Sequence, residues 1–90
     1  MIKYYHCIIK ELNGEQEYIY DYIVKAGSLA EANEIAETHA GKFYNNKPYA
    51  CDGGYVFFGT ISVEVESVIE TTIDDFIKDL FCRYTLTGGE

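Results

Sequence analysis

The sequence predicts an α+β fold of two layers, with two helices on one face of an antiparallel sheet of three to four strands. Three observations predict this fold: a hairpin signal near the N-terminus, two amphipathic helical patterns, and a segment of alternating polarity between those two patterns. The expected order is β-β-α-β-α within a single domain, residues 1–90. A hydrophobic fraction of 48% is typical of a chain that folds around a core.

The first element is a hairpin over residues 3–24. Asn13-Gly14 is its turn signal, because both central residues of a type I′ turn need positive φ. A two-residue loop there would place Leu12 opposite Glu15. The same register gives three further pairs, two of them between opposite charges: Lys10 with Glu17, His6 with Asp21, and Tyr5 with Tyr22.

The two faces of this hairpin differ in polarity. One is continuously apolar or aromatic: Tyr5, Cys7, Ile9, Tyr18, Tyr20, Tyr22 and Val24. The other is interrupted by the charged pairs and carries Tyr4, Ile8, Ile19 and Ile23. One face is expected to pack on the helices, and the tyrosine stripe favours the first. The other face is expected to be covered in part by the chain or by another molecule.

A helix follows the hairpin. Ser28-Leu29-Ala30-Glu31 is a capping box, in which the Ser28 hydroxyl accepts from a helical N–H and Glu31 reaches back. The helix runs to about Phe43, with an apolar stripe at 3.6-residue spacing: Leu29, Ala32, Ile35, Ala36, Ala40 and Phe43. Glu31, Glu34 and Glu37 project outward.

The middle of the chain contains a strand with regular alternation. After turn signals at 45–48 and 51–54, the segment 55–67 puts Tyr55, Phe57, Ile61, Val63 and Val65 on one face. Gly59 falls in phase with them, which favours one long strand bent at Gly59, with a tight turn there as the alternative.

The last predicted element is a helix capped by Thr71 or Thr72. Its apolar stripe is nearly regular: Ile73, Phe76, Ile77, Leu80, Phe81 and Tyr84. Asp74, Asp75 and Asp79 lie on its outer face.

The charge balance bears most directly on function. Fifteen carboxylates against seven basic side chains give a formal net charge of −8, which disfavours direct binding to nucleic acid or to an anionic membrane. Carboxylates three or four residues apart on a helix lie about 5–6 Å apart, comparable to neighbouring phosphates of a DNA strand. Such rows are usually solvated surfaces; the uncompensated charge favours imitation of a nucleic-acid backbone. The residues predicted to bind a partner are Glu31, Glu34, Glu37, Asp74, Asp75, Asp79, Tyr44, Tyr49 and Tyr55.

Catalytic and metal-binding patterns are weak. Cys51, His39, Asp52 and Cys82 are the right ligand types, but they have no zinc-site spacing and no predicted convergence into a Cys-His nucleophile. No phosphate-binding glycine motif is present. We therefore expect a protein that is not an enzyme and holds no metal or cofactor. A small enzyme or ligand-binding module using Cys51, Asp52 and His39 is a third hypothesis.

The profile resembles small acidic proteins of bacteriophages and mobile elements, of the anti-CRISPR or defence-inhibitor type. The similarity is one of style, carried by the Leu12-Asn13-Gly14-Glu15 hairpin and the capped Ser28–Ala32 helix start. It implies a non-enzymatic inhibitor in the host cytoplasm that binds a protein complex with a basic, nucleic-acid-binding surface. Three unevenly spaced cysteines and the lack of a signal peptide or membrane span agree with the cytoplasm. The alternative is a homo-oligomeric accessory protein, for instance a homodimer, that self-associates through the second hairpin face.

Overall fold

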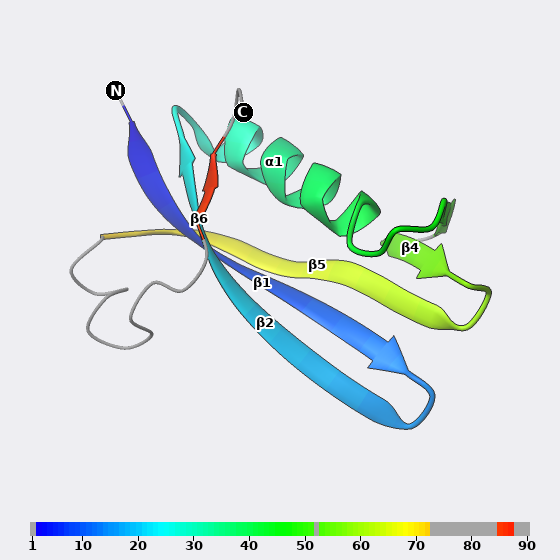
Figure 1. Ribbon diagram of the computed structural model, residues 1–90. Coiled ribbons are helices and arrows are strands. Elements are labelled where there is room, and N and C mark those ends of the chain that lie inside the picture. The colour runs from blue at the N-terminus through cyan, green and yellow to red at the C-terminus, as the bar shows by residue number, and fades with distance from the viewer. Residues whose placement is uncertain (1, 52, 73–84, 88–90) are drawn as a thin grey trace.

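The computed structural model describes residues 2–51, 53–72 and 85–87, which form a six-stranded sheet with a helix across one face (Figure 1). The strands are β1 (Lys3–Asn13), β2 (Gln16–Ala26), β3 (Tyr49–Cys51), β4 (Gly54–Phe57), β5 (Ile61–Thr71) and β6 (Thr85–Thr87), and the helix is α1 (Leu29–Gly41). Their order in the sheet is β3-β4-β5-β1-β2-β6. All neighbours are antiparallel except β2 and β6, which are parallel.

The predicted fold class was wrong in the number of strands and of covering helices. Five strands form an antiparallel sheet, β6 adds a sixth, and α1 is the one helix in the described ranges, instead of two helices on three to four strands. Strand β3 lies between the two predicted turn segments and, at three residues, is too short to show a period. Strand β4 is the first part of the predicted strand 55–67, which a turn separates from β5. The second predicted helix, over 73–84, lies outside the described residues, and Thr71 belongs to β5.

The β1–β2 turn lies one residue later than predicted. Asn13 pairs with Gln16, so Gly14 and Glu15 form the loop, and Gly14 has a φ of +66°. Positive φ at the first loop residue alone is typical of a type II′ turn, which requires glycine there. Glycine therefore takes the position that Asn13 was expected to fill.

The shifted turn moves every cross-strand partner by two residues. Tyr5 pairs with Val24 instead of Tyr22, yet a shift of two leaves each side chain on its predicted face. The charged pairs persist as diagonal contacts, Lys10 with Glu17 at 4.0 Å and His6 with Asp21 at 2.8 Å. The two pairs of opposite charge are therefore compatible with both the predicted and the observed register, because each pair stays on one face of the hairpin.

Helix α1 begins at the predicted capping box. The Ser28 hydroxyl accepts from the Glu31 N–H at 3.2 Å, and the Glu31 carboxylate accepts from the Gly27 N–H at 2.6 Å. The helix ends at Gly41, before Phe43. Its buried face is narrower than the predicted stripe and consists of three alanines spaced four residues apart: Ala32, Ala36 and Ala40. Their small side chains let the helix backbone lie close to the sheet.

The predicted long strand 55–67 is interrupted, because the alternative tight turn is present. The Thr60 N–H donates to the Phe57 carbonyl at 3.1 Å, and the two central residues, Phe58 and Gly59, have φ of +55° and +76°. A left-handed phenylalanine costs roughly 1–2 kcal/mol, so this turn is strained at Phe58. Further along β5, a bulge between its pairings with Ile8 and Ile9 leaves Glu66 without a β1 partner.

The core lies between α1 and the sheet. Tyr5, Cys7 and Ile9 of β1 point toward the helix, as the polarity of the hairpin faces predicted. They pack with Tyr22, Val24, Ala26, Phe57, Val63 and the three helix alanines. The exposure of the β2 tyrosines increases toward the hairpin turn: Tyr22 is buried, Tyr20 is half-buried, and Tyr18 is 44% exposed.

Candidate functional site

The outward face of α1 carries a row of carboxylates. Glu31, Glu34 and Glu37 are all exposed, as the helical spacing predicts, and the helix contains no lysine or arginine. Its remaining ionisable group, His39, is half-buried beside Tyr22, and burial lowers the pKa of His39. The imidazole is therefore neutral at pH 7, and within the helix nothing compensates the three negative charges.

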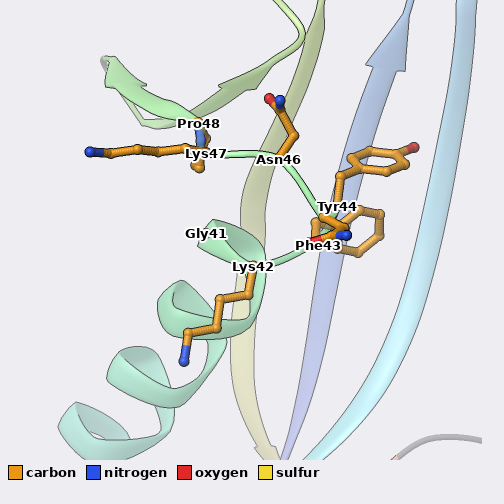
Figure 2. A pocket seen from close by; sticks show the side chains of 8 residues that line it. Gly41, Lys42, Phe43, Tyr44, Asn46, Lys47 and Pro48 are labelled. Atoms are coloured by element: carbon orange, nitrogen blue, oxygen red, sulfur yellow. The ribbon is translucent and has the colours of Figure 1, made fainter.

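The row ends at the loop that follows the helix. Residues 41–48 line a wide, open hollow of about 640 Å³. In Figure 2, Lys42 and Lys47 extend away from β1 and β2, while the rings of Phe43 and Tyr44 turn toward these two strands. The two ammonium groups at the hollow set a boundary to the acidic surface of α1.

Beneath this loop lies a buried carboxylate. Glu11 of β1 is 1% exposed and points toward the helix side, in phase with the apolar residues of its strand. It accepts hydrogen bonds from the hydroxyl of Tyr20, at 2.9 Å, and from the hydroxyl of Tyr44. Two donors make this burial tolerable, because a buried charge without hydrogen bonds is very costly.

Aromatic rings surround the Glu11 cluster, defined here as Glu11, Tyr20 and Tyr44. Phe43 meets both tyrosines edge-on, with centroids 5.1 Å from Tyr20 and 5.5 Å from Tyr44. Tyr44 also contacts Phe57 at 5.4 Å and the exposed Phe58 at 5.9 Å. The Asn46 side chain accepts from the Phe58 N–H at 3.2 Å, so the loop is fixed to the β4–β5 turn.

Sequence reasoning missed Glu11 and assigned Tyr44 to a partner surface. The hydroxyl of Tyr44 is engaged by Glu11, and that hydrogen bond, supported by burial, raises the pKa of Tyr44 to about 12. A signal was available: on the apolar side of β1, Glu11 is the one charged residue in the series Tyr5, Cys7, Ile9 and Glu11. A carboxylate in that phase predicts a buried acid with dedicated donors.

The other two tyrosines predicted to bind a partner differ in exposure. Tyr49 on β3 is 61% exposed and available for contact. Tyr55 on β4 is half-buried, and its ring lies close to Gly41, where an added Cβ would come within 3.3 Å of it. Asp74, Asp75 and Asp79 lie outside the described residues.

A second acidic group lies on the opposite face of the sheet. The ammonium of Lys10 is 3.6 Å from Glu64, 3.5 Å from Glu66 and 4.0 Å from Glu17. The charge of Glu66 is the main cause that raises the pKa of Lys10, and Glu64 and Glu17 add to it. One cation among three carboxylates leaves a local surplus of two negative charges.

The two described groups that were considered for catalysis or metal binding, Cys51 and His39, lie on different elements. Cys7 is buried, and burial raises the pKa of its thiol to about 12, so it is no nucleophile at neutral pH. Cys51 is exposed on β3, whereas His39 packs among rings on α1; Asp52 and Cys82 lie outside the described residues. Among the described side chains, no three of His, Cys, Asp or Glu are grouped as metal ligands.

Comparisons with known proteins give no assignment. No protein-family model matches the chain, and no match was found among curated proteins or solved structures. Within the described part of the chain, no helix is long and apolar enough to cross a membrane.

Proposed function

We propose that this protein is a non-enzymatic inhibitor that binds the basic surface of a nucleic-acid-binding protein, in the manner of an anti-CRISPR protein. The single observation that carries the proposal is the acidic row of α1, Glu31, Glu34 and Glu37, exposed on a helix without a compensating cation. The net charge of −8 supports it, since the surplus is not balanced elsewhere in the chain. Its compartment is the host cytoplasm, where the free thiols of Cys7 and Cys51 remain reduced.

The physics of such binding is electrostatic. Carboxylates three residues apart on a helix lie about 5–6 Å from each other and present a line of charge to lysines and arginines that otherwise hold phosphates. Association between opposite potentials is fast and weakens as salt screens the charges. Glu31 has a second task, because it also caps the helix through the Gly27 N–H. Glu34 and Glu37 are therefore the positions to change.

The test compares two variants with equal charge change. Glu34→Lys with Glu37→Lys reverses the row and spares the cap, while Glu15→Lys with Glu70→Lys reverses two exposed carboxylates on the hairpin turn and on β5. Each protein is used to capture partners from a bacterial lysate at low salt, and bound proteins are challenged with duplex DNA or RNA.

The proposal requires that the wild type and the control variant retain the same nucleic-acid-binding protein, that nucleic acid displaces it, and that the α1 variant does not retain it. Equal retention by all three proteins would contradict it, as would capture that nucleic acid cannot displace.

Self-association through the sheet face opposite α1 is the second candidate. The exposure of Ile19 and Ile69 there, at 51% and 63%, favours it. Against it, Ile23 is fully buried, and the surplus charge around Lys10 would oppose a second copy. A mass in solution that rises with concentration would favour self-association over the acidic-row proposal.

A further inference from the structure

Among the residues that the structure describes, the outer edge of β2 is paired with another strand over only part of its length. β6 pairs with Ile23, Val24 and Lys25, and β1 occupies the other side of the whole strand. Over residues 16–22, no described strand pairs with the outer side. Figure 1 shows this half of the β1–β2 hairpin extending beyond the end of α1.

The backbone groups along this edge can be assigned from the register. Asn13 and Gln16 flank a two-residue turn, so they form a hydrogen-bonded pair, and every second pair along the ladder does the same. The even-numbered residues of β2 therefore bond to β1. The N–H and C=O groups of Glu17, Ile19 and Asp21 point away from β1, along the edge.

The side chains beside this edge give it a chemical character. On the face opposite α1 they read acidic, apolar, acidic: the side chains of Glu17 and Asp21 are 55% and 32% exposed, and Ile19 is 51% exposed. Glu17 stands 4.0 Å from Lys10, the longest of the three contacts of that ammonium, so its charge is the least neutralised of the three. On the other face, Tyr18 offers a ring that is 44% exposed.

We propose that residues 16–22 of β2 bind an extended segment of a basic partner, which adds to the sheet as a further strand. The outward backbone groups would bond the segment, and Glu17 and Asp21 would select it by charge. The basic character of the partner rests on the proposed function; the addition of a strand rests on the edge alone.

The pattern of acids defines the segment. Residues two apart on a strand share a face, and each residue adds about 3.4 Å, so Glu17 and Asp21 stand roughly 14 Å apart. An added strand with an apolar residue opposite Ile19 would place lysine or arginine, four positions apart, opposite the two carboxylates. Its intervening side chains would face Tyr18.

The same pattern disfavours a second copy of this chain as the occupant. An antiparallel copy centred on Ile19 would set Glu17 of one molecule against Asp21 of the other, and like charges directly opposite destabilise a sheet. Acidic flanks thus discourage self-pairing and attract a basic strand, which gives specificity by repulsion as well as by attraction.

The experiment uses the whole protein and three synthetic peptides, followed by amide hydrogen exchange measured by NMR. The first peptide has two lysines four positions apart, a valine midway and threonines elsewhere. The second has glutamates in place of the lysines. The third is the lysine peptide with the edge-facing backbone nitrogens methylated, which keeps the charge and removes the strand hydrogen bonds.

At a lysine-peptide concentration of about 100 times Kd, exchange of the Glu17, Ile19 and Asp21 amides should slow on the order of 100-fold, because only the unbound protein exchanges. Glutamate and methylated peptides should leave these amides unchanged. Equal protection by the methylated peptide, or no protection by any, would overturn strand addition. Equal protection by the glutamate peptide would overturn the charge selection, and protection that rises with protein concentration alone would assign the edge to a second copy.

Matched variants separate this inference from the proposed function. Glu17→Lys should abolish binding of the lysine peptide, while Glu15→Lys, the same charge change in the turn, should retain it. The α1 variant, Glu34→Lys with Glu37→Lys, should bind the peptide as the wild type does. If that variant loses peptide binding and Glu17→Lys does not, the edge is not the site, whatever the role of α1.

Discussion

At the scale of single residues, Glu11 shows how one buried charge can position a loop. Its carboxylate, on β1, accepts hydrogen bonds from the hydroxyl of Tyr20 on β2 and from that of Tyr44, which is 33 residues away in the loop after α1. A buried acid needs both, because removal of a donor leaves part of the desolvation cost unmatched. The Glu11 cluster therefore holds the 42–48 loop on the sheet.

Tyr44→Phe is expected to lower the free energy of unfolding by about 1–3 kcal/mol, because it keeps the ring contacts and deletes one donor to a buried carboxylate. Tyr49→Phe removes a hydroxyl from a residue that is 61% exposed and should change little. Urea denaturation of both variants measures the difference. A loss no larger for Tyr44→Phe than for Tyr49→Phe would mean that Glu11 does not depend on this donor.

The same variant has a signature in pH. Folding raises the pKa of Tyr44 from 10.0 to about 12, so its stabilising contribution is fully present below pH 10 and is lost as pH rises through 12. The stability gap between wild type and Tyr44→Phe should thus narrow between pH 10 and pH 12. A gap of constant size across that range would argue against a hydrogen bond from the neutral hydroxyl.

At the scale of elements, long periodic segments were predictable and short ones were not. Alternation of apolar and polar residues predicts the 11-residue strands β1 and β2. The capping box predicts the start of α1. The β1–β2 register was missed by two residues, because Gly14 fits the first loop position of a type II′ turn as well as the second of a type I′ turn. The strained turn at Phe58 has no sequence signal beyond Gly59.

The candidate site also contains features that the sequence predicts and features that it does not. The exposed row Glu31, Glu34 and Glu37 follows from helical spacing once the cap is placed. The β2 edge could not be predicted, because pairing on that side depends on which distant segment, here β6, lies beside it. The hydrogen bond from Tyr44 to Glu11 could not be predicted either, because Glu11 lies in a strand that is distant in sequence.

The packing of α1 gives a prediction at this scale. Ala36 is fully buried against the sheet, so Ala36→Leu overpacks the interface and should cost about 1–3 kcal/mol of stability. Ala30→Leu, on the exposed side of the same helix, adds the same atoms at nearly equal helix propensity and should stay within about 0.5 kcal/mol of wild type. Thermal or urea unfolding distinguishes the two; equal effects would mean that the helix does not present its alanine face to the sheet.

At the scale of the whole molecule, charge works against folding. A net charge of −8 is confined to a body of 39 × 25 × 21 Å, and mutual repulsion of the surplus carboxylates favours an expanded chain. The attractive contacts of Lys10 oppose this, but they act over only 3.5–4.0 Å. Repulsion between the α1 row and the Lys10 group acts across the molecule. The two terms therefore respond differently to salt.

Added sodium chloride should raise the Tm of this protein. The Debye length falls from about 30 Å at 0.01 M to about 10 Å at 0.1 M salt, which screens repulsion across the molecule before it screens pairs in contact. Glu34→Lys with Glu37→Lys brings the formal charge from −8 to −4, since each reversal adds two, and should flatten the salt dependence. Glu15→Lys with Glu70→Lys makes the same change and should flatten it equally if net charge governs the effect. A Tm that falls with salt would mean that the Lys10 contacts outweigh the repulsion, and the acidic surplus would then be compensated within the fold and less available to a basic partner.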